Sequence, residues 1–154
     1  MENKEYKPIE KDLVSIVLTY FNRKDYIMDQ LDSLLDQTYK NWELIIMDDC
    51  STDGSEDMFR DWMNKNSDRR IIYIKNEKNL GLAKNFEKGL YYTTGEFIAV
   101  CDADDVWFYD KLERQIDFLK KNSDYGMVYS NLVVVDENLK IIKKSFIKNY
   151  LSFF

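Results

Sequence analysis

The segment LVSIVLTYFNRKDYIMDQLDSLLDQTYKNWELIIMDD, residues 13–49, decides the fold class. It opens with an apolar, β-branched run over Val14–Thr19, which is typical of a strand buried on both faces. Apolar residues at helical spacing follow as far as Thr38, with Asn22 as a candidate helix cap. A second apolar run, Trp42–Met47, then repeats the strand pattern. The segment therefore predicts two buried strands joined by a helix.

The same alternation continues along the chain. We expect a third strand at Ile71–Lys75 and a fourth, buried strand at Phe97–Cys101, each followed by a helix. The expected apolar stripes of the three later helices are Met58, Phe59, Trp62 and Met63; Leu82, Phe86 and Leu90; and Leu112, Ile116 and Leu119. Short strands are expected at Met127–Tyr129, Leu132–Val135 and Lys140–Ile142. This order predicts an α/β fold of the Rossmann type, with a mainly parallel sheet, helices on both faces and a C-terminal hairpin.

One domain is expected over residues 13–142, after a polar lead-in at 1–12. The formal net charge of −6 argues against nucleic acid as a partner. Histidine is absent and the two cysteines, Cys50 and Cys101, form no metal or disulfide pattern, so acid–base or metal chemistry must use carboxylates. Reduced thiols and the lack of a long apolar run favour a cytoplasmic protein, at most peripheral at a membrane.

Ligands of open α/β sheets bind at the carboxyl ends of the strands. Three predicted strands end there in polar residues: Thr19-Tyr20-Phe21-Asn22, Asp48-Asp49 and Asp102-Ala103-Asp104-Asp105. Each group alone is also explained by a turn or a helix cap. Three carboxylates within four residues repel one another, however, unless a cation intervenes. Oxygen ligands favour Mg²⁺ or Mn²⁺, which would let an acidic site hold a phosphate.

Four motifs in order resemble family 2 glycosyltransferases of the GT-A fold: SIVLTYFN (15–22), DQTYKNWELIIMDDCSTD (36–53), NLGLAKNFEKGL (79–90) and CDADD (101–105). The last corresponds to that family's DXD motif. The similarity runs from about Val14 to Asp136, and the ordered set is more specific than a DXD alone.

The resemblance implies roles for individual residues. Thr19 matches a position beside the nucleotide base, and Asp49 matches the carboxylate that binds uracil. Asp104 is the first choice as metal ligand, Asp105 the alternative, and Asp102 faces the ribose or the metal's water. Lys84 matches a basic residue near the diphosphate, or else is an ordinary exposed lysine. The full expected nucleotide-binding set is Thr19, Tyr20, Asn22, Asp49, Lys84, Asp102, Ala103 and Asp104.

The resemblance also implies an inverting, metal-dependent transfer of a hexose from a UDP-sugar to a carbohydrate or lipid-linked acceptor, in polysaccharide or glycolipid synthesis. The chain departs from the family pattern at Cys50, where glycine is common. The general base and the acceptor site are expected beyond Phe154, so this fragment alone is expected to be inactive.

Residues 143–154, basic and aromatic, are interpreted as the entry to that region or as a tail, with self-association through the aromatic end as a further possibility. A receiver-like signalling domain and a non-catalytic nucleotide-binding or assembly module are the alternatives.

Overall fold

The computed structural model describes residues 8–143. Two compact units make up the chain, Met1–Arg114 and Gln115–Phe154, and each is described by itself. The first unit contains β1 (Glu10–Tyr20), α1 (Ile27–Leu35), β2 (Trp42–Asp48), α2 (Ser55–Lys65), β3 (Ile71–Lys75), α3 (Leu82–Leu90) and β4 (Gly95–Asp102). Helix α4 (Lys111–Lys121) crosses the boundary, and β5 (Val134–Val135) and β6 (Ile141–Lys143) form a hairpin in the second unit.

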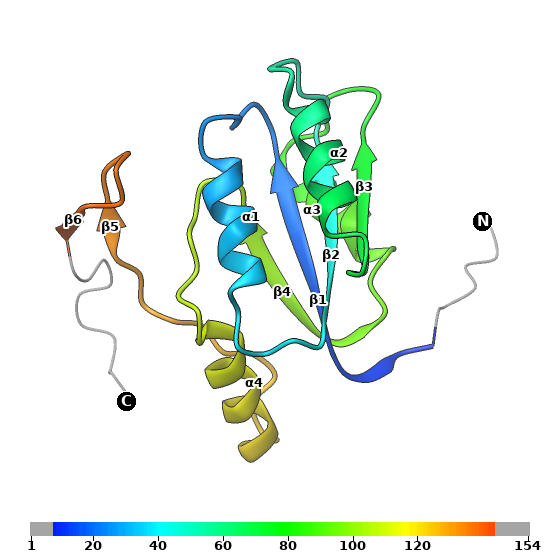
Figure 1. Ribbon diagram of the computed structural model, residues 1–154. Coiled ribbons are helices and arrows are strands. Elements are labelled where there is room, and N and C mark those ends of the chain that lie inside the picture. Colours follow the sequence, from blue (N-terminus) through cyan, green and yellow to red (C-terminus); the bar gives the residue numbers. More distant parts are fainter. Residues whose placement is uncertain (1–7, 144–154) are drawn as a thin grey trace. The chain divides into compact units, whose positions relative to one another are not determined.

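The four longer strands form one parallel sheet in the order β3-β2-β1-β4, with its strands separated along the chain by helices (Figure 1). The predicted α/β class and parallel sheet are therefore confirmed. Successive strands are added on one side of β1 as far as β3, and β4 is then added on the other side. The carboxyl ends of β1 and β4 thus form the topological switch point, where such sheets bind their ligands.

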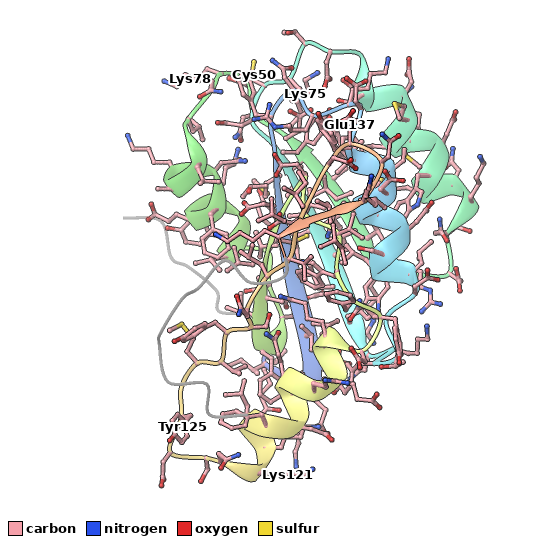
Figure 2. All side chains as sticks on the ribbon, turned by 90° about the vertical axis from the view of Figure 1, so that its left-hand side faces the viewer. Cys50, Lys75, Lys78, Lys121, Tyr125 and Glu137 are labelled. Atoms are coloured by element: carbon pink, nitrogen blue, oxygen red, sulfur yellow. The ribbon has the colours of Figure 1, made fainter. Side chains whose placement is uncertain are left out.

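Helices cover both faces of the sheet because side chains alternate along each strand. On one face Val17, Ile45 and Met47 are buried against the partly buried Phe86 and Leu90 of α3. The opposite face carries α1 and α2, and Figures 1 and 2 show these two helices across the sheet from α3. There the ring of Phe59 meets that of Tyr20 edge-on at 4.9 Å between centroids.

Strand β4 differs from its prediction as a fully buried strand. Ile98 and Val100 are 51% and 59% exposed. Within the described residues β4 pairs with β1 alone, so it is an edge strand, while α3 packs on β1 and β2. The face of the sheet that α3 covers is therefore buried over β1 and β2 but exposed over β4. Leu82 is likewise exposed rather than part of the buried stripe of α3.

Element ends also differ in places. β1 begins at Glu10, within the predicted lead-in, and its register with β4 shifts between Glu10 and Val14, where Asp12 has a φ of 63°. The predicted hairpin is present but shorter, and residues 127–129 form no strand. The segment 144–154, for which an acceptor-region or tail role is expected, lies outside the described residues.

Candidate functional site

The switch point brings Thr19 and Asp102 together. They are partners in the β1–β4 register, and the hydroxyl of Thr19 donates to Oδ1 of Asp102 at 3.3 Å. Thr19 is buried whereas Asp102 is exposed. The hydroxyl thus orients a carboxylate that stays accessible at the rim of the sheet.

The turn after β4 presents the remaining acidic residues. Ala103 is buried, while Asp104 and Asp105, which follow it, are exposed. Burial, followed by the charges of Asp102 and Asp104, raises the pKa of Asp105 above its ordinary value. Mutual repulsion of the three carboxylates thus adds to burial, which is the larger cause of the shift.

Two cationic side chains lie at this cluster, and no sequence motif pointed to either of them. Nε of Arg23 lies 3.1 Å from Oδ2 of Asp104. Lys111 is half-buried, its Nζ is 4.7 Å from the centroid of the Trp107 ring, and burial lowers its pKa. The positive charge of Lys111 opposes the upward pKa shift of Asp105. The acidic rim is therefore partly compensated by the chain itself.

Asp49 is held inside the protein. It is only 3% exposed, and its carboxylate accepts hydrogen bonds from Asn76 Nδ2 at 2.9 Å and from the main-chain N–H groups of Leu80 and Gly81 at 2.8 Å each. Oδ1 takes two of these bonds and Oδ2 takes one. A carboxylate offers about four acceptor positions, so Oδ2 retains capacity for one more donor.

The network continues behind Asp49. Asn76 also donates to Asn85 Oδ1 and accepts from Lys88 Nζ, both at 2.8 Å, and Asn85 donates to the carbonyl of Met47. The loop between β3 and α3 is thereby fixed to the end of β2. Sequence reasoning missed this network, although the mainly polar run at 76–81, which ends in Gly81, was a signal of a shaped loop. In the structure Gly81 has a φ of 80°.

Asn22 is not the cap of α1, which has Tyr26 at its N-cap. Its Oδ1 accepts from Thr52 N–H at 2.9 Å and its own N–H donates to Ser51 Oγ at 3.1 Å. Asn22 therefore ties the end of β1 to the turn that follows β2.

Tyr20 and Asp48 have internal partners. The buried ring of Tyr20 donates its hydroxyl to Asp53, and burial followed by this bond raises its pKa. Its main-chain carbonyl accepts from Asp49 N–H at 2.8 Å. Asp48 is fully buried and accepts from Ser51 N–H and from the hydroxyl of Tyr73. Asp48 thus orders the turn, and the hydroxyl and carbonyl of Tyr20 both bond within the chain.

Lys84 and Cys50 flank the site. Lys84 is exposed in the first turn of α3 and makes no hydrogen bond or ion pair within residues 8–143. Cys50 has a φ of 67°, in the left-handed region that glycine adopts without cost. Figure 2 shows Cys50 with Lys75 and Lys78 at the same end of the molecule. Cys101, by contrast, is buried, and burial raises its thiol pKa, so it is unsuited to nucleophilic chemistry.

The acidic rim fits a divalent cation that arrives together with a phosphate ligand. Residues 8–143 contain no cluster of three His, Cys, Asp or Glu side chains arranged to hold a metal by themselves. Mg²⁺-type ions, however, are commonly bound by one or two carboxylates plus substrate phosphates. Asp102, Asp104 and Asp105 meet that requirement because they are exposed at the rim.

The sheet order and the acidic rim define a Rossmann-like α/β domain of the GT-A type. The order β3-β2-β1-β4 does not match the 2-1-3-4-5 order of receiver domains, so the receiver alternative is wrong. The model of the family "Glycosyl transferase family 2" matches residues 15–154. The chain belongs to this family.

Comparisons with individual proteins also support membership of this family. The chain is 42% identical over 113 residues to the putative teichuronic acid biosynthesis glycosyltransferase TuaG of Bacillus subtilis, covering 73% of this chain and 44% of the relative. It is 37% identical over 126 residues to the Escherichia coli UDP-Glc:alpha-D-GlcNAc-diphosphoundecaprenol beta-1,3-glucosyltransferase WfgD, covering 82% and 48%. The chain thus spans about half the length of the curated relatives it matches.

Among solved structures, the mannosyltransferase PcManGT of Pyrobaculum calidifontis, in complex with GDP-Man and Mn²⁺, superposes with a TM-score of 0.67 at 26% identity. The match covers 75% of this chain and 33% of that one. Separately, no helix within residues 8–143 has the length and apolar character needed to cross a membrane.

Proposed function

We propose that this chain is the donor-binding part of an inverting, metal-dependent glycosyltransferase that moves a hexose from a UDP-sugar to an acceptor hydroxyl in polysaccharide or glycolipid synthesis. The observation that carries the proposal is the meeting of Thr19 and Asp102 at the switch point, with Asp104 and Asp105 directly beyond. The UDP-sugar named for WfgD and the Mn²⁺ bound by PcManGT support it.

The proposed roles are those that the family resemblance implies, and the positions of the side chains support them as follows. Thr19 and Asp102 face the nucleoside, and the remaining acceptor position on Asp49 Oδ2 suits the single N–H of a uracil ring. Asp104, with Asp105 as the alternative, holds the divalent cation beside the diphosphate. A bound cation would offset the negative charge that develops on the leaving diphosphate. Lys84, which has no hydrogen bond or ion pair among the described residues, would add positive charge near the diphosphate.

The acceptor is proposed to be a carbohydrate or a lipid-linked sugar, since a diphosphoundecaprenol-linked sugar is the acceptor named for WfgD. Such an acceptor would place the whole protein at the surface of a membrane on the cytoplasmic side.

Calorimetric titration of the chain with UDP, with and without Mn²⁺, tests the donor site. We expect binding that requires the metal, and we expect Asp104→Asn to weaken it while the circular dichroism spectrum stays unchanged. Asp61→Asn is the matched control, because Asp61 is exposed on α2 and has no hydrogen bond or ion pair within the described residues. Metal-independent binding, no binding, or equal effects of the two variants would contradict the proposal.

A further inference from the structure

Arg23 occupies an unusual place in the candidate site. It lies three residues beyond the end of β1, and it reaches Asp104, which lies two residues beyond the end of β4. Its Nε is 3.1 Å from Oδ2 of Asp104, and its Nη1 is 3.4 Å from the carbonyl oxygen of Asn22. The guanidinium is thus held over the rim by the carboxylate that is proposed to bind the metal.

The Arg23–Asp104 ion pair has the properties needed to exchange partners at little energetic cost. Both side chains are about half exposed, at 51% and 47%, and exposed ion pairs of this kind contribute little to stability. A guanidinium has five N–H donors in a planar fork, and the two contacts of the Arg23 side chain, to Asp104 and to the neighbouring carbonyl of Asn22, use only part of them. Breaking the pair therefore costs little, and donors remain for a second ligand.

The charge of the rim explains why such an exchange would help. Asp102, Asp104 and Asp105 together repel an anionic diphosphate, and a single divalent cation offsets only part of this charge. Arginine binds phosphate oxygens in a bidentate manner. A guanidinium that already lies next to Asp104 needs only to turn to reach a phosphate bound through a metal on that same carboxylate.

We propose that Arg23 changes partner when the donor binds: it neutralises Asp104 in the free chain and donates to the diphosphate once a divalent cation takes that carboxylate. This inference rests on the proposed function of the site. It assigns Arg23 to donor binding, in addition to the residues expected from the sequence motifs.

The test compares UDP with uridine, which lacks the diphosphate, by nuclear magnetic resonance titration in Mg²⁺. We expect Arg23→Gln to weaken UDP binding by about tenfold or more, as the loss of a charge-assisted contact implies, and to leave uridine binding unchanged. Arg23→Lys should recover part of the loss. Lys24→Gln is the matched control, since it removes the same charge from the adjacent exposed residue.

The outcomes separate the two proposals. If the unmodified chain fails to bind UDP in Mg²⁺, the proposed function fails and this inference fails with it. If the unmodified chain binds UDP and Arg23→Gln binds equally well, the partner exchange alone is wrong. A parallel loss of UDP and uridine affinity, or an equal loss in Lys24→Gln, would also overturn it, because either result indicates an effect on the fold or on the general field rather than on the diphosphate.

Discussion

The carboxylate of Asp49 should be as important for stability as for ligand binding. Replacing it with asparagine preserves its shape but leaves one oxygen to serve the N–H donors of Asn76, Leu80 and Gly81. One donor would then face an amide N–H₂ group, and the other two would lose their charged acceptor. Hydrogen bonds to charged groups contribute about 1.5–3 kcal/mol and neutral ones about 1 kcal/mol. We therefore expect Asp49→Asn to lower the free energy of unfolding by about 2–4 kcal/mol.

Urea denaturation, monitored by circular dichroism, tests this expectation. The urea concentration at the midpoint should fall, while the slope of the unfolding free energy against urea concentration stays unchanged. Amide hydrogen exchange provides a local readout, because the N–H groups of Leu80 and Gly81 should exchange faster in the variant. Asp61→Asn, which removes the same charge from an exposed position, should change stability by less than about 0.5 kcal/mol. If Asp49→Asn were as stable as this control while losing UDP binding, Asp49 would act on the ligand alone and the anchoring argument would be wrong.

Cys50→Gly should raise the free energy of unfolding by about 0.5–1 kcal/mol in urea denaturation, because it relieves a left-handed φ of 67°; a loss of stability would refute the strain argument. Gly89→Ala should destabilise by about 1–2 kcal/mol, since its Cβ would lie 2.6 Å from Val17 Cγ1 and 2.9 Å from Met47 Cγ, and Val17→Ala in the same chain should remove only the part of that penalty due to Val17. Although burial raises the pKa of Asp53, hydrogen bonds from Ser55 and Tyr20 lower it overall. Its stabilising effect should therefore be present above about pH 4 and fade as pH falls through the lowered value, so that acid titration of Asp53→Asn shows a shallower loss than the unmodified chain.

Strand and helix order could be read from the sequence because periodicity is a local property. The apolar runs of β1, β2 and β3 and the helical spacing in α1 and α2 require only neighbouring residues to be recognised. The acidic turn after β4 was also visible, since its residues are adjacent in the chain. The ordered motifs indicated the family, which the family model confirms over residues 15–154.

The sequence could not predict which side chains form ion pairs and hydrogen bonds with one another, because the partners are distant along the chain. Arg23 and Asp104 are 81 positions apart, and Asp49 is about 30 from the loop amides that hold it. Burial of β4 was overestimated for the same reason. An apolar strand shows the same pattern at the edge as at the centre of a sheet, and strand order is set by tertiary pairing.

The sequence by itself thus determined the class of fold, the family and the acidic character of the rim, because these depend on local patterns of residue type. Only the tertiary structure decided that Asp49 anchors a loop, that Tyr20 turns its side chain into the core and that Arg23 neutralises Asp104. Each of these depends on which strands are neighbours, and that choice is made by packing the whole sheet at once.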